Sequence, residues 1–376
     1  MRSATIKAYF NYGGLARPDE RVLHRAAAVE REFAPLLYSE DGVRMLEATL
    51  GAARQAAASL LGARASGGVS LLPNSSTALN LAISIVGQTL APGDIAITTD
   101  QEHPCVAWPL ARLAARGVKV VALGGGSPAE FLDGLGATLR ERRPGFAVFS
   151  HVSCKDGRVL PVEEAGALLA AREIPYIVDG AQALGQVAVD LARIGAWAYA
   201  FTGHKWLCGP MGMGGLWTGE RFLRANRLAW SGPLGFARAG GGELESGTLN
   251  CALVAGMAEA LRLCAAELPQ RVAMLAKIRA RVAAMLDPLY ANADPRWAGP
   301  HAPGMLAYDL PPDSNSEELA AAALHRYGVA IKPLRAPYEP NGFRITYSPR
   351  TGDAELGLLG DAMRALAAES KLDAPN

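Results

Sequence analysis

Two charged residues follow apolar, strand-like runs, where their chemistry differs from that of ordinary surface charges. Asp179 comes directly after Tyr176–Val178, and Lys205 comes shortly after Ala198–Phe201. Lysine is rarely buried without a purpose, and a lysine amine held among apolar residues can form a Schiff base with an aldehyde. Pyridoxal phosphate requires such a lysine together with a carboxylate that pairs with its ring nitrogen. The pair therefore predicts pyridoxal 5'-phosphate as cofactor, with Lys205 and Asp179 as catalytic residues.

Two further segments fit the same chemistry. Asn74–Thr77 opens a helix after a strand-like run, where hydroxyls and free N–H groups suit a phosphate. His103 follows another such run, and an imidazole there can stack on a flat ring and assist proton transfer. Taken alone, each segment also fits a structural role, as a hydroxyl cap, a loop histidine or, for Asp179, a helix cap. Because all four segments follow strands, together they favour one site.

The elements that must position these residues alternate between helices and short apolar runs. A helix is expected over residues 43–62, where apolar side chains recur at helical spacing and a glycine ends the run. Strands are expected at residues 69–73, 95–99, 118–123, 147–150, 176–179 and 198–201. Such alternation predicts an α/β fold in which a mainly parallel sheet lies between helices. Ligands of these sheets bind at the carboxyl ends of the strands.

The pattern changes after residue 250. A long helix is expected from Cys251 to Leu275, interrupted at Pro269 and continuing toward Leu286. Shorter strands are expected at residues 304–308, 329–331 and 343–346. We therefore expect a large domain over residues 16–250 and a smaller α+β domain over residues 251–376. The N-terminal segment 1–15 is expected to pack on the small domain.

Composition excludes several classes of protein. The 376 residues carry 37 Lys and Arg against 36 Asp and Glu, so no basic excess indicates a nucleic acid or an anionic membrane as partner. No apolar run reaches the ~18 residues of a membrane span, and the N-terminus lacks the features of a secretory signal. The five cysteines show no CxxC spacing, so neither disulfides nor a metal site are expected. We expect a cytoplasmic protein.

At these residues the sequence resembles the class V aminotransferase family of fold-type I pyridoxal phosphate enzymes. Within it, the sequence is most similar to the branch of cysteine desulfurases, cysteine or cystine C–S lyases and isopenicillin N epimerases. The resemblance runs from Tyr9–Gly14 almost to the C-terminus, and its most specific parts are Asp179–Gln182 and Thr202–Lys205. It implies that Gln182 bonds the phenolic oxygen of the cofactor and that His103 stacks on its ring. It implies phosphate contacts from Ser75, Ser76, Thr202 and His204.

The resemblance also implies a second subunit and a substrate site. Thr248, in Glu245–Asn250, matches a loop residue that reaches the phosphate of the partner, which implies a homodimer with active sites at the subunit interface. Arg344 matches the arginine that holds the carboxylate of a small amino-acid substrate. A planar guanidinium can grip a carboxylate through two hydrogen bonds, although a lone arginine also fits a surface ion pair. Asn11, Gly14 and Cys154 are the other expected substrate contacts, and Cys154 alternatively fits a small buried apolar residue.

One departure bears on the reaction. Desulfurases of this family attack the substrate sulfur with a cysteine shortly before the arginine. Here Lys332–Pro340 holds no cysteine, and neither does any other position in residues 265–376. We therefore expect a C–S β-lyase that converts cystine or a cysteine S-conjugate to a thiol or persulfide, pyruvate and ammonia. An aminotransferase or an epimerase remains the alternative, with a desulfurase less favoured and a catalytically idle binding protein a further possibility. Specificity is expected to depend also on Trp230–Gly232.

Overall fold

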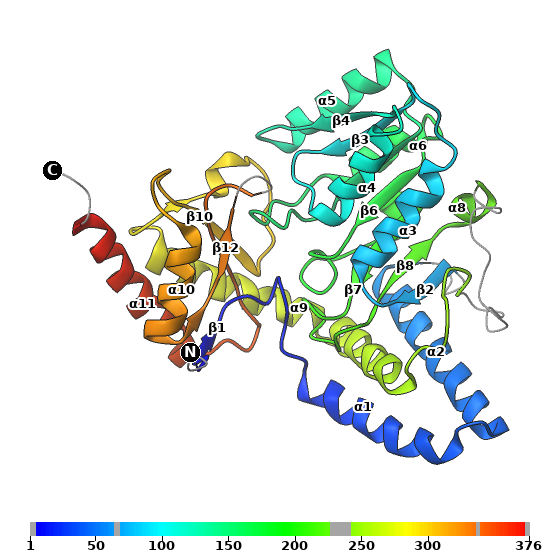
Figure 1. Ribbon diagram of the computed structural model, residues 1–376, viewed down its shortest axis with the longest axis horizontal. Helices are drawn as coiled ribbons and strands as arrows, with labels where there is room; N and C mark the ends of the chain where they lie inside the picture. The colour runs from blue at the N-terminus through cyan, green and yellow to red at the C-terminus, as the bar shows by residue number, and fades with distance from the viewer. Residues whose placement is uncertain (1–4, 64–67, 226–241, 336–338, 373–376) are drawn as a thin grey trace. The chain divides into compact units, whose positions relative to one another are not determined.

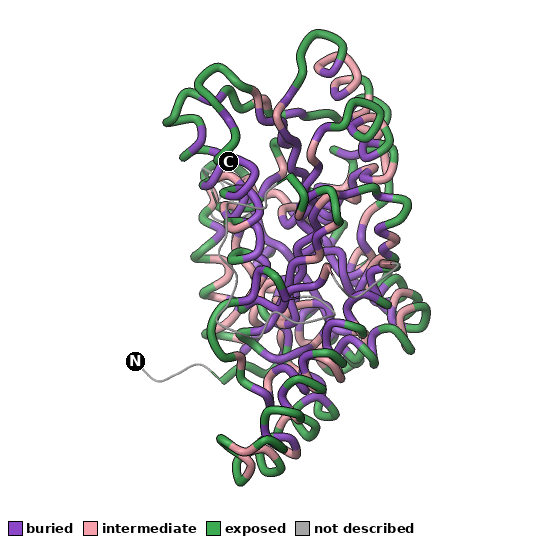
Figure 2. Tube along the Cα trace, turned by 90° about the vertical axis from the view of Figure 1, so that its right-hand side faces the viewer, coloured by how far each residue is buried: buried purple, intermediate pink, exposed green. Residues whose placement is uncertain are grey.

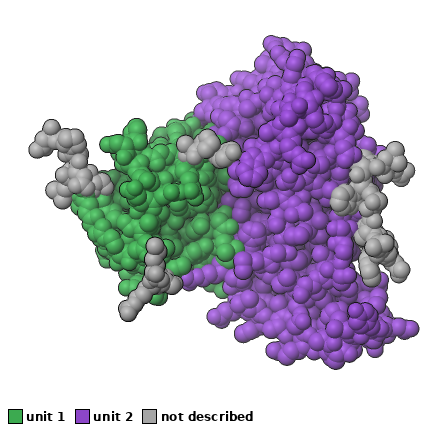
Figure 3. All heavy atoms as spheres, viewed as in Figure 1, with its two compact units in different colours: residues 1–16, 153–159, 269–376 green, residues 17–152, 160–268 purple. Residues whose placement is uncertain are grey.

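The computed structural model describes residues 5–63, 68–225, 242–335 and 339–372. The chain divides into two compact units, coloured in Figure 3, and each is described by itself. Unit 1 holds residues 1–16, 153–159 and 269–376, and unit 2 holds residues 17–152 and 160–268. The segment Trp230–Gly232, expected to influence specificity, lies outside the described residues.

Unit 2 is built on a seven-stranded sheet with the order β2-β8-β7-β6-β5-β3-β4 (Figure 1). The strands are β2 (Val69–Leu72), β3 (Ile95–Thr99), β4 (Lys119–Leu123), β5 (Phe146–Ser150), β6 (Tyr176–Asp179), β7 (Ala198–Thr202) and β8 (Gly214–Thr218). Pairing from β4 to β7 is parallel, which confirms the expected α/β fold. Strand β8 is antiparallel to both its neighbours and was not expected. Its glycines resemble loop sequence, because glycine weakens a strand and gives it no side chain to pack.

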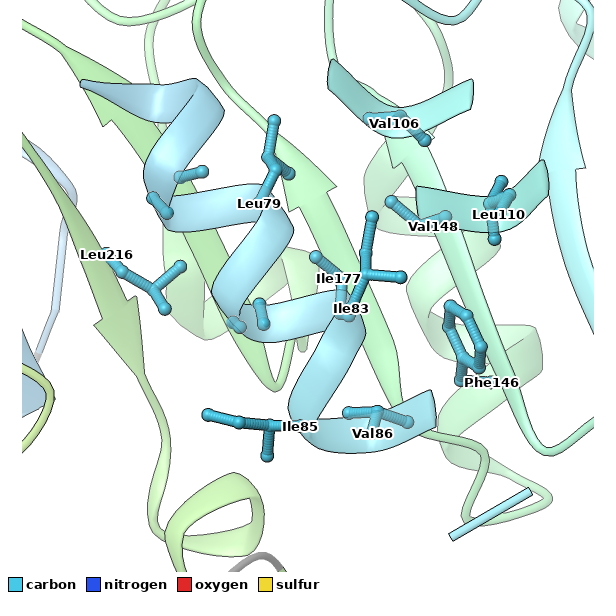
Figure 4. Packing of buried hydrophobic residues seen from close by; sticks show 14 of the residues in the cluster. Leu79, Ile83, Ile85, Val86, Val106, Leu110, Phe146, Val148, Ile177 and Leu216 are labelled. Atoms are coloured by element: carbon cyan, nitrogen blue, oxygen red, sulfur yellow. The ribbon is translucent and has the colours of Figure 1, made fainter. Parts of the chain in front are cut away.

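Helices cover both faces of this sheet. On one face, α3 (Ser75–Gly87) and α4 (Pro104–Ala114) bury Leu79, Ile83 and Val106 against side chains of β5, β6 and β8 (Figure 4). On the other, Phe131 of α5 (Pro128–Glu141) meets Phe149 of β5 edge to face at 5.3 Å. Each such side chain contributes about 1.5–3 kcal/mol when fully buried. Figure 2 shows that the buried residues gather in the interior of the trace, whereas turns and outer helix faces are exposed.

The remaining helices of unit 2 frame this core. They include α1 (Glu20–Phe33), α2 (Glu40–Leu60), α6 (Val162–Ala170), α7 (Leu191–Ile194) and α8 (Glu220–Ala225), together with the first part of a long helix that begins at Cys251. Helix α2 confirms the helix expected over residues 43–62, and its first residues are capped by Ser39, which accepts from the N–H of Gly42 at 3.0 Å.

Unit 1 contains a four-stranded antiparallel sheet with the order β12-β13-β10-β9 and a parallel pair of short strands. The sheet strands are β9 (Ala291–Asn292), β10 (Met305–Asp309), β12 (Lys332–Leu334) and β13 (Gly342–Thr346). Strand β1 (Ala8–Tyr9) pairs with β11 (Val329–Ala330), and the helices are α10 (Ser316–Tyr327) and α11 (Asp353–Leu372). Tyr308 and Phe343 stack at 5.3 Å across β10 and β13.

Helix α9 (Cys251–Leu286) runs without interruption through Pro269, so the expected break there was wrong. Proline removes one intrahelical hydrogen bond at a cost of about 3 kcal/mol. Buried apolar residues on both sides of the proline, such as Leu261 and Val282, offset that cost. The division into units falls at residue 269, which assigns residues 251–268 to unit 2. The domain limits expected from the sequence stay predictions.

Candidate active site

The expected cofactor residues of unit 2 come together at one edge of the sheet. Strands β3, β5, β6 and β7 run parallel, so their carboxyl ends share this edge. Strand β8 runs antiparallel to both β7 and β2, so β2 also ends there, just before Ser75. The register places Asp179 opposite Ser150 on β5 and Ala200 on β7. The topology therefore brings the ends of five strands to one edge, and the four segments that the sequence analysis grouped into one site follow four of these strands.

Asp179 is a buried carboxylate at the centre of this edge. Asp179 is only 5% exposed, and its Oδ1 accepts a hydrogen bond from the N–H of Ala181 at 2.8 Å. Burial raises the pKa of Asp179, while the Ala181 N–H, the charge of Lys205 and the thiol of Cys105 oppose that rise. The charge of Lys205 is thus close enough to act on Asp179. Gly180 follows Asp179, and a Cβ at this position would lie 2.0 Å from the Tyr199 ring, so a glycine fits here where a larger residue would clash.

Lys205 is half-buried in the turn that follows β7. Its carbonyl accepts from the N–H of Cys208 at 2.9 Å, and Gly209 donates to Gly203 at 2.8 Å, so the turn closes on itself. Cys208 adopts φ +52°, a left-handed conformation that the turn requires. The neighbouring Trp206 and Leu207 are buried. Lys205 therefore extends from a constrained, largely apolar segment, as the sequence indicated.

Gln182 is oriented by a tryptophan. Its Oε1 accepts from the indole Nε1 of Trp206 at 2.8 Å, and both residues are buried. The indole N–H can only donate, so it selects the oxygen of the amide and assigns the NH₂ group to the other side. An NH₂ group suits the phenolic oxygen that the resemblance assigns to Gln182.

His103 caps the helix that it precedes. Its Nδ1 accepts from the N–H of Cys105 at 3.1 Å at the start of α4. In the neutral ring the proton therefore lies on Nε2. The side chain is exposed, as a ring available for stacking must be.

The phosphate candidates lie at the start of α3 and at the end of β7. Asn74 caps α3 by accepting from the N–H of Thr77 at 2.9 Å, and the first N–H groups of a helix have no partner inside it. Ser75 is buried and Ser76 is exposed. At the end of β7, Thr202 Oγ1 lies 3.0 Å from His204 Nδ1. Burial and the charge of Lys205 lower the pKa of His204, which favours its neutral ring.

Thr248 lies on an exposed segment that a buried ion pair anchors. Glu245 pairs with Arg54 through Nη2 at 2.6 Å and Nε at 3.0 Å, and it accepts from the N–H of Leu71 at 2.8 Å. These bonds fix the segment to β2, which leads directly to Ser75. The contact of Thr248 with a second subunit stays a prediction.

Glu102, beside His103, is a buried acid that the sequence analysis did not assign to the site. Its carboxylate accepts from Thr99 Oγ1 at 2.6 Å, from the N–H of Ser150 at 2.9 Å and from Ser150 Oγ at 2.7 Å. Burial raises the pKa of Glu102 to about 7, and the charge of Asp179 adds to the rise. The two bonds from Ser150 fasten the β3–α4 turn, which carries His103, to the end of β5, and the bond from Thr99 ties the turn to the end of β3.

The expected substrate residues all lie in unit 1. Arg344 on β13 is only 2% exposed, and its guanidinium donates to the backbone carbonyl of Cys154. Its Nε has no hydrogen-bond partner among the described residues, and burial lowers the pKa of Arg344. The nearby acid Glu339 is paired with Lys332 at 3.0 Å. Because a buried charge is costly without a partner, this guanidinium is suited to an external carboxylate. An ion pair at the surface, the other reading of Arg344, is wrong.

Asn11 and Gly14 lie together in the N-terminal segment of the same unit. Asn11 bridges to Thr346 at the end of β13, and its Oδ1 is buried with no hydrogen-bond partner within the described part of the chain. A Cβ on Gly14 would lie 2.7 Å from the amide of Asn11, so glycine leaves room for that side chain. Cys154 is buried, which fits the alternative interpretation of this residue as a small buried apolar side chain. Substrate contacts by these residues stay predictions.

A sequence model described as aminotransferase class-V matches residues 18–333. The chain belongs to this family. Isopenicillin N epimerase from Streptomyces clavuligerus is 30% identical over 87% of this chain and 87% of its own. Cysteine desulfurase IscS from Serratia proteamaculans is 32% identical over 50% of this chain and 45% of its own.

Two solved structures show how widely the fold is shared. The apo cysteine desulfurase of Thermococcus onnurineus superimposes with a TM-score of 0.84 at 21% identity, over 97% of both chains. A cystine C–S lyase in complex with its product cysteine persulfide gives a TM-score of 0.78 at 22% identity, over 94% of this chain and 96% of its own. The fold is therefore that of fold-type I pyridoxal phosphate enzymes.

Membership of this family makes pyridoxal 5'-phosphate the cofactor of this class V enzyme. The residues present fit it, since Asp179 is a buried carboxylate whose pKa responds to the charge of Lys205, and Trp206 orients the amide of Gln182 through its oxygen. Across the described residues, no group of three or more metal-ligating side chains occurs. No helix in the described part of the chain is long and apolar enough to cross a membrane.

Three residues that shape this site were missed from the sequence: Glu102, Cys105 and Trp206. Glu102 is adjacent to His103 and lies three residues after the end of β3, so an acidic residue close to a strand end was the available signal. Cys105 was considered only for disulfides and metals. Trp206 directly follows Lys205, but nothing in sequence spacing links its indole to Gln182.

Proposed function

We propose that this protein is a pyridoxal phosphate-dependent C–S β-lyase acting on cystine or a cysteine S-conjugate. The products are a thiol or persulfide, pyruvate and ammonia. The observation that carries the proposal is a complete set of cofactor residues combined with no cysteine anywhere in residues 265–376.

Each residue has a defined task in this proposal. The cofactor supplies an electron sink for the charge that builds on the substrate α-carbon. Asp179 keeps the proton on the ring nitrogen, and Arg344 binds the substrate carboxylate. The Nζ of Lys205 removes the α-proton. The β-carbon–sulfur bond then breaks, and its electron pair leaves with the sulfur. The remaining aminoacrylate hydrolyses to pyruvate and ammonia.

A desulfurase is disfavoured because that reaction needs a protein thiolate to take the sulfur. The five cysteines are Cys105, Cys154, Cys208, Cys251 and Cys264, and none of them lies in the region shortly before Arg344 where desulfurases of the family carry theirs. One solved neighbour is a cystine C–S lyase bound to cysteine persulfide, so elimination is among the reactions that proteins of this fold catalyse.

The test is a product assay with purified holoenzyme. Pyruvate and ammonia should form in equal amounts from cystine or cysteine S-conjugates. Lys205→Ala should abolish them, whereas Lys119→Ala, on the exposed start of β4, should not. Formation of alanine or of a new keto acid in place of pyruvate would contradict the proposal.

Epimerisation is the second candidate, because an isopenicillin N epimerase aligns with 87% of this chain. The same Lys205 and Asp179 serve it, since the cofactor does not determine which bond is remade. Solvent deuterium entering the α-carbon, with loss of optical activity and no pyruvate, would favour the epimerase. A stable amino form of the cofactor that a keto acid reverses would instead favour transamination.

We further propose a cytoplasmic homodimer in which Thr248 contacts the phosphate of the partner. The exposed position of Thr248, on a segment anchored by Arg54 and Glu245, supports this contact. Sedimentation of the holoenzyme should give twice the chain mass, and Thr248→Ala should weaken cofactor binding. A monomer with full cofactor affinity would contradict the proposal.

A further inference from the structure

Cys105 touches both residues that are expected to face the cofactor ring. It lies in the first turn of α4 and is 9% exposed. Its Sγ is 3.8 Å from Oδ2 of Asp179, and its backbone N–H donates to Nδ1 of His103. The other carboxylate oxygen of Asp179 is held by Ala181. Asp179 is thus held from two sides, once by backbone and once by this thiol.

We propose that Cys105 is a positioning residue for Asp179, with its S–H donating to Oδ2 and fixing the orientation of the carboxylate. The proposal deepens the role proposed above for Asp179 as partner of the cofactor ring nitrogen. It does not depend on whether the reaction is elimination or epimerisation.

The backbone around Cys105 is fixed, so the thiol cannot simply move away. Glu102 ties the preceding turn to Ser150 through two hydrogen bonds, and Ser150 lies opposite Asp179 in the register of β5 and β6. His103 then holds the N–H of Cys105. The distance from Cys105 to Asp179 is therefore set by the sheet and the turn together.

The chemical benefit of the thiol lies in the charge of Asp179. Burial favours the protonated carboxyl, whereas a donor to the carboxylate favours the ionised form. Only the ionised form keeps the ring nitrogen protonated. The thiol, the Ala181 N–H and the charge of Lys205 all act in this direction. Removal of the thiol should therefore weaken cofactor binding without removing any group that contacts the cofactor's phosphate.

The test compares Cys105→Val with Cys251→Val. Cys251 is a matched control, because it is 3% exposed and its thiol lies 3.7 Å from Thr49 Oγ1. Cofactor affinity is measured by titrating the apoprotein and following the visible absorbance. We expect about tenfold weaker binding for Cys105→Val, the loss of one hydrogen bond to a charged group, and less than about twofold change for Cys251→Val. Cys105→Ser restores a donor and should recover most of the affinity.

A second measurement leaves Cys105 in place. The infrared S–H band of the apoprotein should shift to higher wavenumber in Asp179→Asn, because an amide accepts less strongly than a carboxylate. This arm remains decisive if Cys105→Val does not fold.

The outcomes separate the two claims. If Asp179→Asn loses cofactor affinity but Cys105→Val keeps it, Cys105 is not a positioning residue and the role of Asp179 stands. An S–H band that does not respond to Asp179→Asn overturns the contact. If Asp179→Asn binds the cofactor as the wild type does, the proposed role of Asp179 itself fails.

Discussion

Replacement of Arg344 by methionine should stabilise the protein while removing substrate binding. The guanidinium is buried, donates to a single backbone carbonyl, and leaves Nε without a partner among the described residues. Such a charge costs several kcal/mol of desolvation in the free protein. The carboxylate of a bound substrate would offset this desolvation cost. Methionine fills a similar volume without a charge, so Arg344→Met removes both the desolvation cost and the group that binds the substrate carboxylate.

The expected magnitudes follow from these contacts. Replacing buried ionic groups with apolar ones is often stabilising by about 1–4 kcal/mol. Loss of the bond to the carbonyl of Cys154 subtracts about 1 kcal/mol. We therefore expect the free energy of unfolding to rise by up to about 3 kcal/mol. Loss of two charge-assisted hydrogen bonds to the substrate costs about 3 kcal/mol or more, which lowers kcat/KM by at least about 100-fold.

Arg158 supplies the matched control in the same unit. It is also buried, but its Nε and Nη2 pair with the buried Asp156 at 3.1 and 2.8 Å. Arg158→Met leaves that carboxylate unpaired and should destabilise by about 3–5 kcal/mol. Both variants are compared by urea unfolding of the apoprotein and by steady-state kinetics. Equal destabilisation by the two substitutions would refute the reasoning, because it would give Arg344 a structural partner within the protein.

Two further predictions concern the sheet edge. Burial raises the pKa of Glu102 to about 7, above that of an unfolded glutamate, so its proton stabilises the fold below about pH 4.5 and this contribution is lost as the pH rises toward 7. The free energy of unfolding of Glu102→Gln relative to that of the wild type should therefore rise by about 3 kcal/mol between about pH 4.5 and pH 7. Urea unfolding at a series of pH values measures this difference, and a difference that does not change with pH would contradict the prediction. Gly180→Ala should destabilise by about 1–3 kcal/mol, because the new Cβ meets the Tyr199 ring at 2.0 Å. Gly51→Ala, in open space on α2, should instead stabilise by about 1 kcal/mol, and a similar effect of both would refute the steric argument.

The strands and their common edge were predictable because local patterns encode them. Asp179 and Lys205 could be paired in advance, since the carboxyl ends of parallel strands must share an edge. Strand β8 was missed because a segment that begins with two glycines is typical of a loop. Its pairing with β7, which the local sequence does not reveal, makes it a strand. Pro269 was expected to break α9, because the packing that holds the helix on both sides cannot be read from the residues themselves.

Contacts through space account for the rest of what the sequence could not supply. The thiol of Cys105 meets Asp179 across many intervening residues, and the indole of Trp206 orients Gln182 by a hydrogen bond. The sequence identified Arg344 as a candidate through its resemblance to a family motif. Its burial without an acidic partner, which supports a ligand there, became visible only in the fold.

Every catalytic role proposed above requires that Lys205 binds the cofactor covalently. Borohydride reduction of the holoenzyme, followed by peptide mass spectrometry, tests it most directly. We expect a pyridoxyl group on the ε-nitrogen of Lys205, within the peptide that follows β7, and none after Lys205→Ala. A label on another lysine, or no label on a protein that shows the visible absorbance of the cofactor, would contradict it.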